Sequence, residues 1–227
     1  IEKESNLFPS EIIMSCTGYS DKNISVLSGP SHAEEVIRKY PTAVVSVCSD
    51  IDHARKVQKL FSNQYFRVYS GNDVIGVEVG GSAKNIIAIA AGTCYGLGYG
   101  DNTIAALVTR GLEEISRLGT VLGAQQSTFS GLSGMGDLIV TAFSPHSRNR
   151  EVGERIGKGE HLSDILASMK MVAEGVDTAC SIHDLTVKQN INMPICEQIY
   201  KILFEEVSPR TAILELMGRE LVDEHPG

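Results

Sequence analysis

The stretch VEVGGSAKNIIAIAAGT, residues 77 to 93, constrains the fold of this chain most strongly because it is almost free of charge. From residue 74 to residue 100, only Glu78 and Lys84 carry a charge at neutral pH. The run predicts a buried helix of a globular protein, because it is broken by glycines and shorter than the roughly 20 apolar residues of a membrane span. Lysine is rarely buried without a partner, so Lys84 needs an explanation.

Two explanations of Lys84 remain open from this segment alone. Gly80, Gly81 and Ser82 precede it and a helix-forming run follows, which predicts that Lys84 lies in the first turns of a helix. There, burial and the positive end of the helix dipole both weaken the hold of the ammonium group on its proton, so the lysine can exchange a proton with a substrate. Alternatively, the ammonium group extends to the surface and its stem covers apolar neighbours.

The overall charge narrows the class of partner. A formal charge of −8 argues against sequence-independent binding to nucleic acid or to an anionic membrane, because both need a basic surface. Small molecules or proteins are the expected partners. Five dispersed cysteines without a CxxC pair indicate neither a disulfide framework nor a zinc site, which fits a reducing cytoplasm and predicts no metal.

The order of strand-like and helix-like segments divides the chain near residue 80. Residues 24 to 69 alternate between the two types, as in the βαβ units of a parallel or mixed sheet, whereas no strand is evident afterwards. We expect an α/β partial dinucleotide-binding unit in residues 1–78, followed by an all-α substrate-binding, catalytic and dimerisation domain in residues 79–227. No GxGxxG motif opens a helix after a strand and the chain does not begin with methionine, so we expect a fragment or processed product whose first βαβ unit lies upstream.

Capping residues predict the ends of three later helices. Asn102 is the expected N-cap of a long amphipathic helix, and Gly123 follows its last turn. Pro194 is expected in the first turn of another helix. A third is expected to have Ser208 as its cap and Gly218 at its end.

Asp137 is the first candidate partner for Lys84. It follows three glycines in the segment GLSGMGDLIVT, residues 131 to 141, and precedes an apolar run where a carboxylate needs a partner. It could orient Lys84. Equally, an aspartate in this place could cap a helix that begins at Leu138.

Ser147, Arg148 and Asn149 stand together at an expected helix start. Backbone amides, a guanidinium group, an amide and a hydroxyl at such a point can converge on an anion such as phosphate. The alternative is a solvated basic helix face, to which Arg150, Arg155 and Lys158 would belong.

Two glycine-containing turns are less informative. In LSGPSHAEE, residues 27 to 35, small residues follow a strand, where open α/β sheets bind ligands, but an ordinary turn looks the same. GLGYGDNT, residues 96 to 103, predicts a break between helices.

The segments SGPSHA, DVIGVEVGGSAKNIIAIAAG, TRGLEEISRLG, GLSGMGDLIVT, SRNREVG, VAEGVDT and MPICEQIY occur in a particular order. In that order they resemble the NAD(P)-dependent glycerol-3-phosphate dehydrogenases, from Ile24 to about Glu220. The resemblance implies interconversion of sn-glycerol 3-phosphate and dihydroxyacetone phosphate with hydride transfer to or from NAD or NADP. It also implies a cytoplasmic homodimer that supplies glycerophospholipid synthesis.

The resemblance assigns roles to individual positions. It implies that Lys84 is the general acid and base and that Asp137 assists it. The implied substrate-binding positions are Gly29, Ser31, Asn85, Thr141, Ser147, Arg148 and Asn149. The implied cofactor-binding positions are Ala33, Arg148, Val172 and Glu174.

Some features depart from the family pattern and leave alternatives. The amino-terminal GxGxxG motif and a further substrate-contacting lysine are not found, and His32 stands where the family commonly has an apolar aromatic residue. If the 227 residues are the entire polypeptide, we expect the chain alone to be inactive. The alternatives are a related β-hydroxyacid dehydrogenase, whose usual Lys-x-x-x-Asn spacing is not found after Lys84, and a non-catalytic helical dimerisation or binding module.

Overall fold

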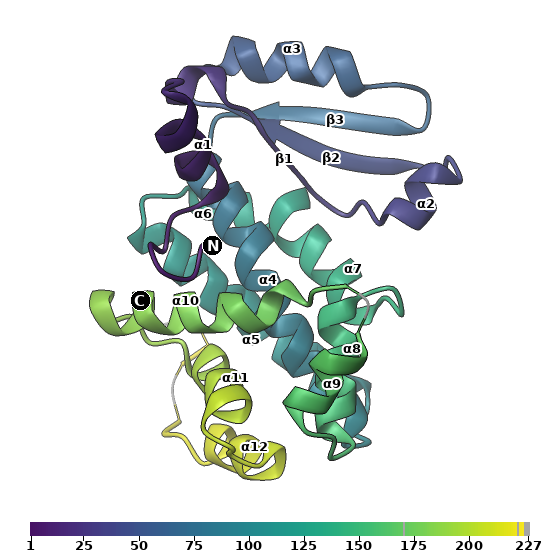
Figure 1. Ribbon diagram of the computed structural model, residues 1–227, viewed down its shortest axis with the longest axis vertical. Coiled ribbons are helices and arrows are strands. Elements are labelled where there is room, and N and C mark those ends of the chain that lie inside the picture. The colour runs from purple at the N-terminus through teal and green to yellow at the C-terminus, as the bar shows by residue number, and fades with distance from the viewer. Residues whose placement is uncertain (170, 222, 225–227) are drawn as a thin grey trace.

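The computed structural model describes residues 1–169, 171–221 and 223–224, and it consists of a small sheet above a group of helices (Figure 1). The strands are β1 (Val26–Ser28), β2 (Thr42–Val47) and β3 (Phe66–Gly71), in the order β1-β2-β3. β1 is antiparallel to β2, with Val26 opposite Val47, and β2 is parallel to β3, with Val44 opposite Val68. The predicted alternation of strands and helices is therefore confirmed and produces a mixed sheet.

Two helices connect the strands, and a third precedes them. α2 (Ala33–Ile37) lies between β1 and β2, and α3 (Ile51–Phe61) forms the crossover from β2 to β3 and covers one face of the sheet (Figure 1). Asp50 caps α3 by accepting a hydrogen bond from the Asp52 amide. α1 (Pro9–Thr17), followed by the short 3₁₀ helix η1 (Asp21–Asn23), was not predicted from the sequence.

α1 is held against the helical region by a buried carboxylate. The Ser10 amide and hydroxyl donate hydrogen bonds of 2.8 and 2.7 Å to the carboxylate of Glu78. Burial raises the pKa of Glu78, and the two hydrogen bonds oppose this shift. Glu78, the other charged residue of the apolar run, is thus satisfied by a segment 68 residues earlier in the chain.

The central helix of the molecule is α4 (Val74–Gly96), which passes through the predicted domain boundary at residue 78 without interruption. Its N-cap is Asp73, whose carboxylate accepts hydrogen bonds from the Gly76 and Gln125 amides at 3.0 Å. The prediction that Lys84 lies in the first turns of its helix is wrong, because this cap lies eleven residues before it (84 − 73). The helix dipole, which acts within the terminal turns, therefore does not account for the properties of Lys84.

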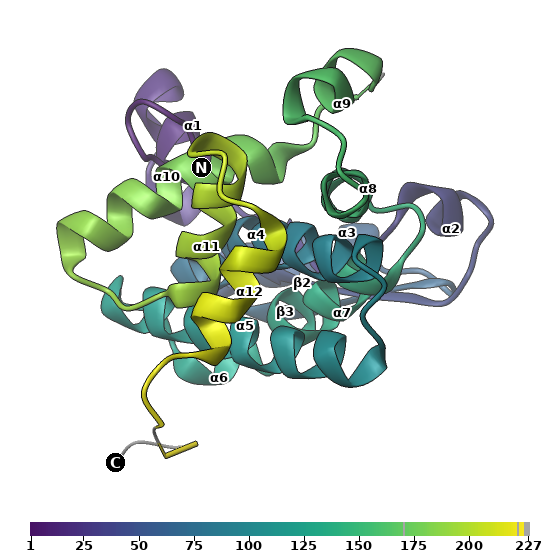
Figure 2. The same cartoon turned by 90° about the horizontal axis from the view of Figure 1, so that it is seen from below.

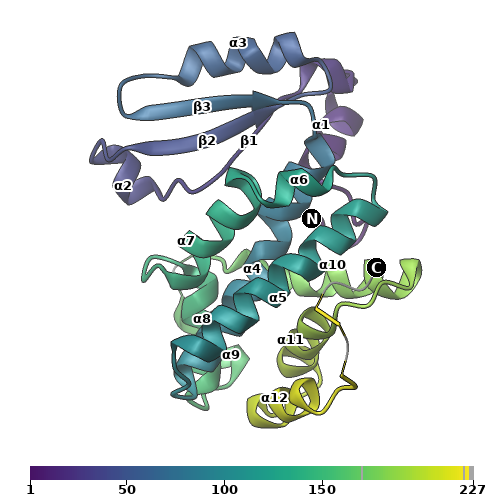
Figure 3. The ribbon, with the colours of Figure 1, turned by 180° about the vertical axis from the view of Figure 1, so that it is seen from behind.

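The remaining elements surround α4, as the view from below shows (Figure 2). They are α5 (Asp101–Val121), α6 (Gln126–Phe129), the π-helical turn η2 (Leu132–Gly136), α7 (Asp137–Phe143), α8 (Arg148–Gly157), α9 (Leu162–Ser168), α10 (Glu174–Gln189), α11 (Pro194–Phe204) and α12 (Pro209–Met217). Within the described residues no strand follows residue 80, as expected. From behind, α5 crosses α4, and α6 lies beside the end of α4 that is nearest the sheet (Figure 3).

Most of the predicted helix ends are confirmed. Pro194 begins α11, Ser208 caps α12 through the Thr211 amide, and Gly218 follows the last residue of α12. Asn102 is not the N-cap of α5, because that helix begins at Asp101 after Gly100. The glycine-rich segment before α5 is a break between two helices, as expected.

α4 and α8 pack unusually closely because glycines meet at their crossing. A Cβ atom added to Gly92 or Gly96 would lie 2.0 or 2.2 Å from a backbone oxygen of α8. The reciprocal positions, Gly153 and Gly157, would place a Cβ 1.9 or 2.4 Å from a backbone oxygen of α4. Four glycines at matching intervals thus let the two backbones touch, which fixes the start of α8 relative to Lys84.

Among the described residues, α4 alone is long and apolar enough to cross a membrane. However, 72% of its most apolar window is buried by other parts of the protein. Such burial is typical of the core helix of a globular fold, which is the structure predicted from the apolar run.

Candidate functional site

A polar cavity of about 210 Å³ lies where the end of β1 meets α4, α7 and the starts of α8 and α10. Its lining contains both groups of candidate residues from the sequence, the Lys84 region and the anion-binding region. The lining residues are Gly29, Ser31, His32, Gly81, Lys84, Asn85, Asp137, Val140, Thr141, His146, Ser147, Arg148, Asn149 and Glu174.

Lys84 and Asp137 form an ion pair at this cavity. Lys84 Nζ lies 2.5 Å from Asp137 Oδ2, and the two side chains are only 18% and 6% exposed. Burial raises the pKa of Asp137, whereas the Lys84 charge and hydrogen bonding oppose the rise. Lys84 is therefore not a surface lysine with an extended stem, and its ammonium group is held at a fixed point in the cavity wall.

Local backbone structure places Asp137 in that position. The π-helical turn η2 leads directly into α7, of which Asp137 is the first residue, and the N-cap is Gly136. The Asp137 carboxylate makes no capping hydrogen bond, so the structure does not realise the capping alternative. Instead, Thr141 one turn later donates to the Asp137 carbonyl oxygen at 2.6 Å and lies 3.4 Å from Oδ1.

The start of α8 forms the second part of the cavity. Ser147 is the N-cap of α8, and its hydroxyl oxygen accepts a hydrogen bond from the Arg150 amide. Arg148 Nη1 donates to the Val172 carbonyl oxygen at 2.8 Å, and Asn149 Oδ1 accepts from the Gly175 amide at 2.9 Å. These contacts tie the start of α8 to the start of α10 and leave further nitrogen donors of Arg148 and Asn149 available for an anion.

The turn after β1 closes the third side. Gly29 has a φ of 141°, a conformation that favours glycine, and a Cβ atom there would lie 2.9 Å from Val44 Cα. The Ser31 hydroxyl donates to the Gly29 carbonyl oxygen at 2.9 Å. The turn residues Gly29 and Ser31 therefore line the cavity because the backbone passes directly over β2.

Most of the predicted site residues come together, but two do not line this cavity. Ala33 lies at the start of α2, and Val172, with a 67% exposed side chain, lines a neighbouring cavity of about 620 Å³. Gly81, Asn85 and Glu174 border both cavities. His146 was not considered in the sequence analysis, and His32 was noted only as a departure from the family pattern.

The neighbouring cavity has a mixed apolar and polar lining. Val26 and Val172 provide an apolar wall, and Glu174 and Asn85 provide polar groups next to Lys84. The hydroxyl oxygen of Ser25, which also lines this cavity, is buried and has no hydrogen-bond partner among the described residues. A bound amide or ribose group could satisfy it.

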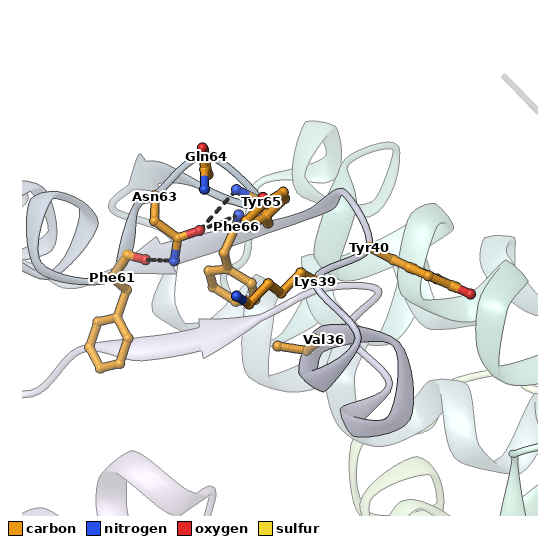
Figure 4. Close-up of a pocket in the computed structure, with 8 residues that line it drawn as sticks. All are labelled: Val36, Lys39, Tyr40, Phe61, Asn63, Gln64, Tyr65 and Phe66. Atoms are coloured by element: carbon orange, nitrogen blue, oxygen red, sulfur yellow. Dashed lines mark hydrogen bonds between the residues drawn. The ribbon is translucent and has the colours of Figure 1, made fainter.

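A third cavity, of about 420 Å³, lies at the far end of the sheet beside α2 and the turn before β3 (Figure 4). Half of its eight lining side chains are aromatic, and Asn63 fixes the turn by accepting hydrogen bonds from the Tyr65 and Phe66 amides. Lys39 is the one charged residue that lines it. Because it has no paired acid and base, this cavity lacks the groups for proton transfer.

Two family models match the chain. The model described as the C-terminus of NAD-dependent glycerol-3-phosphate dehydrogenase matches residues 73–214, and the model of the N-terminus matches residues 1–54. A glycerol-3-phosphate dehydrogenase [NAD(P)+] from Solidesulfovibrio magneticus is 51% identical over 224 residues, which are 99% of this chain and 68% of that protein. The protein of the same name from Lysinibacillus sphaericus is 56% identical over 86% of this chain and 58% of its own length.

A crystal structure of glycerol-3-phosphate dehydrogenase from Coxiella burnetii has a similar fold. Its TM-score is 0.91 at 38% identity, and the match covers 95% of this chain and 66% of the other. The chain thus spans roughly three fifths to two thirds of the length of the proteins that it matches.

Proposed function

The chain belongs to the NAD-dependent glycerol-3-phosphate dehydrogenase family, and from this premise we propose that its site interconverts sn-glycerol 3-phosphate and dihydroxyacetone phosphate. The observation that carries the proposal is one cavity in which the Lys84–Asp137 pair lies together with the donors at the start of α8. The substrate has one group for each part of the cavity. Its carbinol or carbonyl carbon suits the Lys84–Asp137 pair, and its phosphate group suits the donors at the start of α8. A β-hydroxyacid dehydrogenase is not retained, because both family models and the relatives named above are glycerol-3-phosphate dehydrogenases.

Lys84 is the group that moves the proton. In the oxidation direction, its amine accepts the proton of the C2 hydroxyl, and in the reduction direction its ammonium group returns a proton to the C2 oxygen. Asp137, at 2.5 Å, fixes the direction of the Lys84 side chain. NAD or NADP supplies the other half of the reaction as acceptor or donor of the hydride at C2.

The phosphate group determines where the reacting carbon lies. Arg148 and Asn149 each have nitrogen donors beyond those used within the protein, and Ser147 stands at the same helix start. Binding energy from the phosphate, which does not react, can therefore hold C2 next to Lys84. Thr141, Asn85, Gly29 and Ser31 line the space between and would contact the rest of the substrate.

Two adjoining cavities support the proposed cofactor-binding positions. Glu174 and Val172 border the larger cavity, and Arg148 is hydrogen-bonded to the Val172 carbonyl oxygen. We assign the nicotinamide end to this space, with Ala33 at the start of α2 as a further contact. In that arrangement Asn85 and Glu174 lie between substrate and cofactor.

The cellular setting is part of the same proposal. The protein acts in the cytoplasm as a homodimer, and its product supplies glycerophospholipid synthesis. Support for self-association comes from apolar side chains that are exposed in the described chain, including Val187 on α10 and Leu214 and Met217 on α12. Light scattering of the purified full-length protein would test the dimer.

The activity is tested with the full-length protein that contains this chain. Purified protein should oxidise NADH or NADPH when dihydroxyacetone phosphate is added, and should not do so with dihydroxyacetone. Following the absorbance of the reduced cofactor measures both. Oxidation of a 3-hydroxy acid without any turnover of dihydroxyacetone phosphate would contradict the proposal.

A further inference from the structure

His32 has a buried ring nitrogen that has no partner among the described residues, and the residue lines the polar cavity. The residue follows the Gly-Pro-Ser turn after β1 and precedes α2, and its ring lines the polar cavity. Its Nε2 atom is buried and has no hydrogen-bond partner among the described residues. A buried, unsatisfied nitrogen costs free energy, so a native protein that keeps one usually has a ligand for it.

A second imidazole places His32 at the anion-binding side of the cavity. The His146 ring meets the His32 ring edge to face, with centroids 6.0 Å apart and planes at 65°. His146 immediately precedes Ser147, the N-cap of α8. His32 is therefore next to the helix start that carries Arg148 and Asn149.

The Lys84–Asp137 ion pair is not hydrogen-bonded to His32 among the described residues. Burial raises the pKa of Asp137, and the charge of His32 is one of the influences that oppose this rise. Asp137 Oδ2 contacts Lys84, and Asp137 Oδ1 lies within reach of Thr141. Among the described residues, no hydrogen bond joins His32 to Asp137, although both line the cavity. The Nε2 atom thus has no hydrogen-bond partner among the described residues, and the residue that carries it lines the cavity.

We propose that His32 is a specificity-determining residue, whose Nε2–H donates a hydrogen bond to a phosphate oxygen of the bound substrate. This inference rests on the proposed function and adds a donor on the β1 side to those of Arg148 and Asn149 on the α8 side. A phosphate dianion offers three terminal oxygens, and donors from two sides fix its orientation as well as its position.

The test compares His32 variants of the full-length protein that contains this chain. His32→Phe keeps an aromatic ring and removes both nitrogens, whereas His32→Gln keeps an amide nitrogen near the Nε2 position. His161→Phe, at an exposed site that does not line the cavity, is the matched control. The readouts are kcat and KM for dihydroxyacetone phosphate and the inhibition constant of inorganic phosphate.

Loss of one hydrogen bond to a charged group should raise KM roughly tenfold or more in His32→Phe and should change kcat little. The inhibition constant of phosphate should rise by a similar factor. His32→Gln should recover most of both changes, and His161→Phe should resemble the wild type. If His32→Phe does not fold, His32→Asn replaces it, because its shorter amide cannot reach the Nε2 position.

Two results would overturn the inference. One is an unchanged KM and phosphate inhibition constant in His32→Phe, which would make His32 a structural residue only. The other is a fall in kcat at constant KM, which would mean that His32 acts through the Lys84–Asp137 pair. If the wild type does not turn over dihydroxyacetone phosphate, the proposed function fails, and calorimetric binding of inorganic phosphate to the wild type and His32→Phe still decides the role of His32.

Discussion

Two buried carboxylates of this protein, Asp137 and Glu114, have similar exposure and different surroundings. Glu114 on α5 accepts hydrogen bonds from the Ile195 and Cys196 amides, at 2.8 and 3.1 Å, at the start of α11. It lines none of the cavities described above, and burial raises its pKa to about 7. Asp137 contacts an ammonium group, and both face a cavity.

This contrast shows that burial of a charged residue does not by itself identify a reaction site. Glu114 is used to join α5 to α11, because its oxygens satisfy amides that the first turn of a helix leaves without partners. The Lys84–Asp137 pair keeps one side open to a ligand. The Lys84–Asp137 pair therefore differs from Glu114 because it can still contact a ligand in a cavity.

The largest expected effect is the loss of turnover on changing Lys84. Lys84→Met retains most of the stem and removes the proton carrier, so kcat for dihydroxyacetone phosphate reduction should fall roughly 100- to 10,000-fold. Steady-state kinetics of the full-length protein measures this. Turnover close to that of the wild type would show that Lys84 does not transfer the proton. The distinction between a reactive Lys84–Asp137 pair and a structural Glu114 would then no longer hold.

Glu114 should affect stability and its pH dependence. Because its folded pKa of about 7 lies above the unfolded value of 4.5, the folded state binds more protons than the unfolded state between these pH values. The contribution of Glu114 to the free energy of unfolding is therefore fully present below pH 4.5 and is lost as the pH rises through 7. The total loss is roughly 3 kcal/mol.

Glu114→Gln should flatten this part of the stability profile and leave kcat nearly unchanged. Urea unfolding at a series of pH values, with the wild type measured in parallel, provides the test. The same slope in both proteins would show that Glu114 is not the titrating group.

The helix contact beneath the site should be sensitive to a single methyl group. Gly153→Ala would place Cβ 1.9 Å from the Ile89 carbonyl oxygen, so α8 must move away from α4. We expect a loss of roughly 1–3 kcal/mol in the free energy of unfolding, together with a higher KM because the start of α8 shifts. The control is Gly159→Ala. Gly159 has open space around it and a φ of 95°, so an alanine there strains the backbone without a steric clash. Equal KM values in the two variants would contradict the proposed link between this helix contact and the site.

The smallest expected effect is on Arg148. Arg148→Lys keeps the charge but cannot provide several planar donors, so KM for the phosphorylated substrate should rise roughly tenfold with a smaller change in kcat. Initial-rate kinetics at varied substrate concentration checks this. A fall in kcat alone would indicate that Arg148 acts on the reacting carbon rather than on the phosphate.

The sequence predicted the fold class and the family, and the resemblance drawn from seven ordered segments is confirmed by the family models. Local patterns were sufficient for β2, α3 and α11, because strand alternation and capping depend on nearby residues. They were misleading at Lys84, where two glycines suggested a helix start. Gly80 instead lies inside α4. A Cβ atom at this position would lie 2.7 Å from the Ser133 carbonyl oxygen, so the glycine allows close packing and does not mark a helix start.

Contacts between distant segments could not be predicted. Lys84 and Asp137 are 53 residues apart (137 − 84), and nothing local to either fixes their separation of 2.5 Å. Ser10 gave no indication that it would satisfy Glu78, and α1 was missed with it. His32 differed visibly from the family pattern, but only the structure shows that the residue lines the cavity and that its Nε2 atom has no partner among the described residues.

The central position of α4 has a consequence for how the molecule opens. This helix contacts α5, α7, α8, α10 and α11, and it also carries the contact of Glu78 with α1. Its backbone amides can be exposed to solvent only when most of the helical region separates, so they should be among the last in the described chain to exchange hydrogen for deuterium. The site is thus attached to the part of the protein that we expect to open least often.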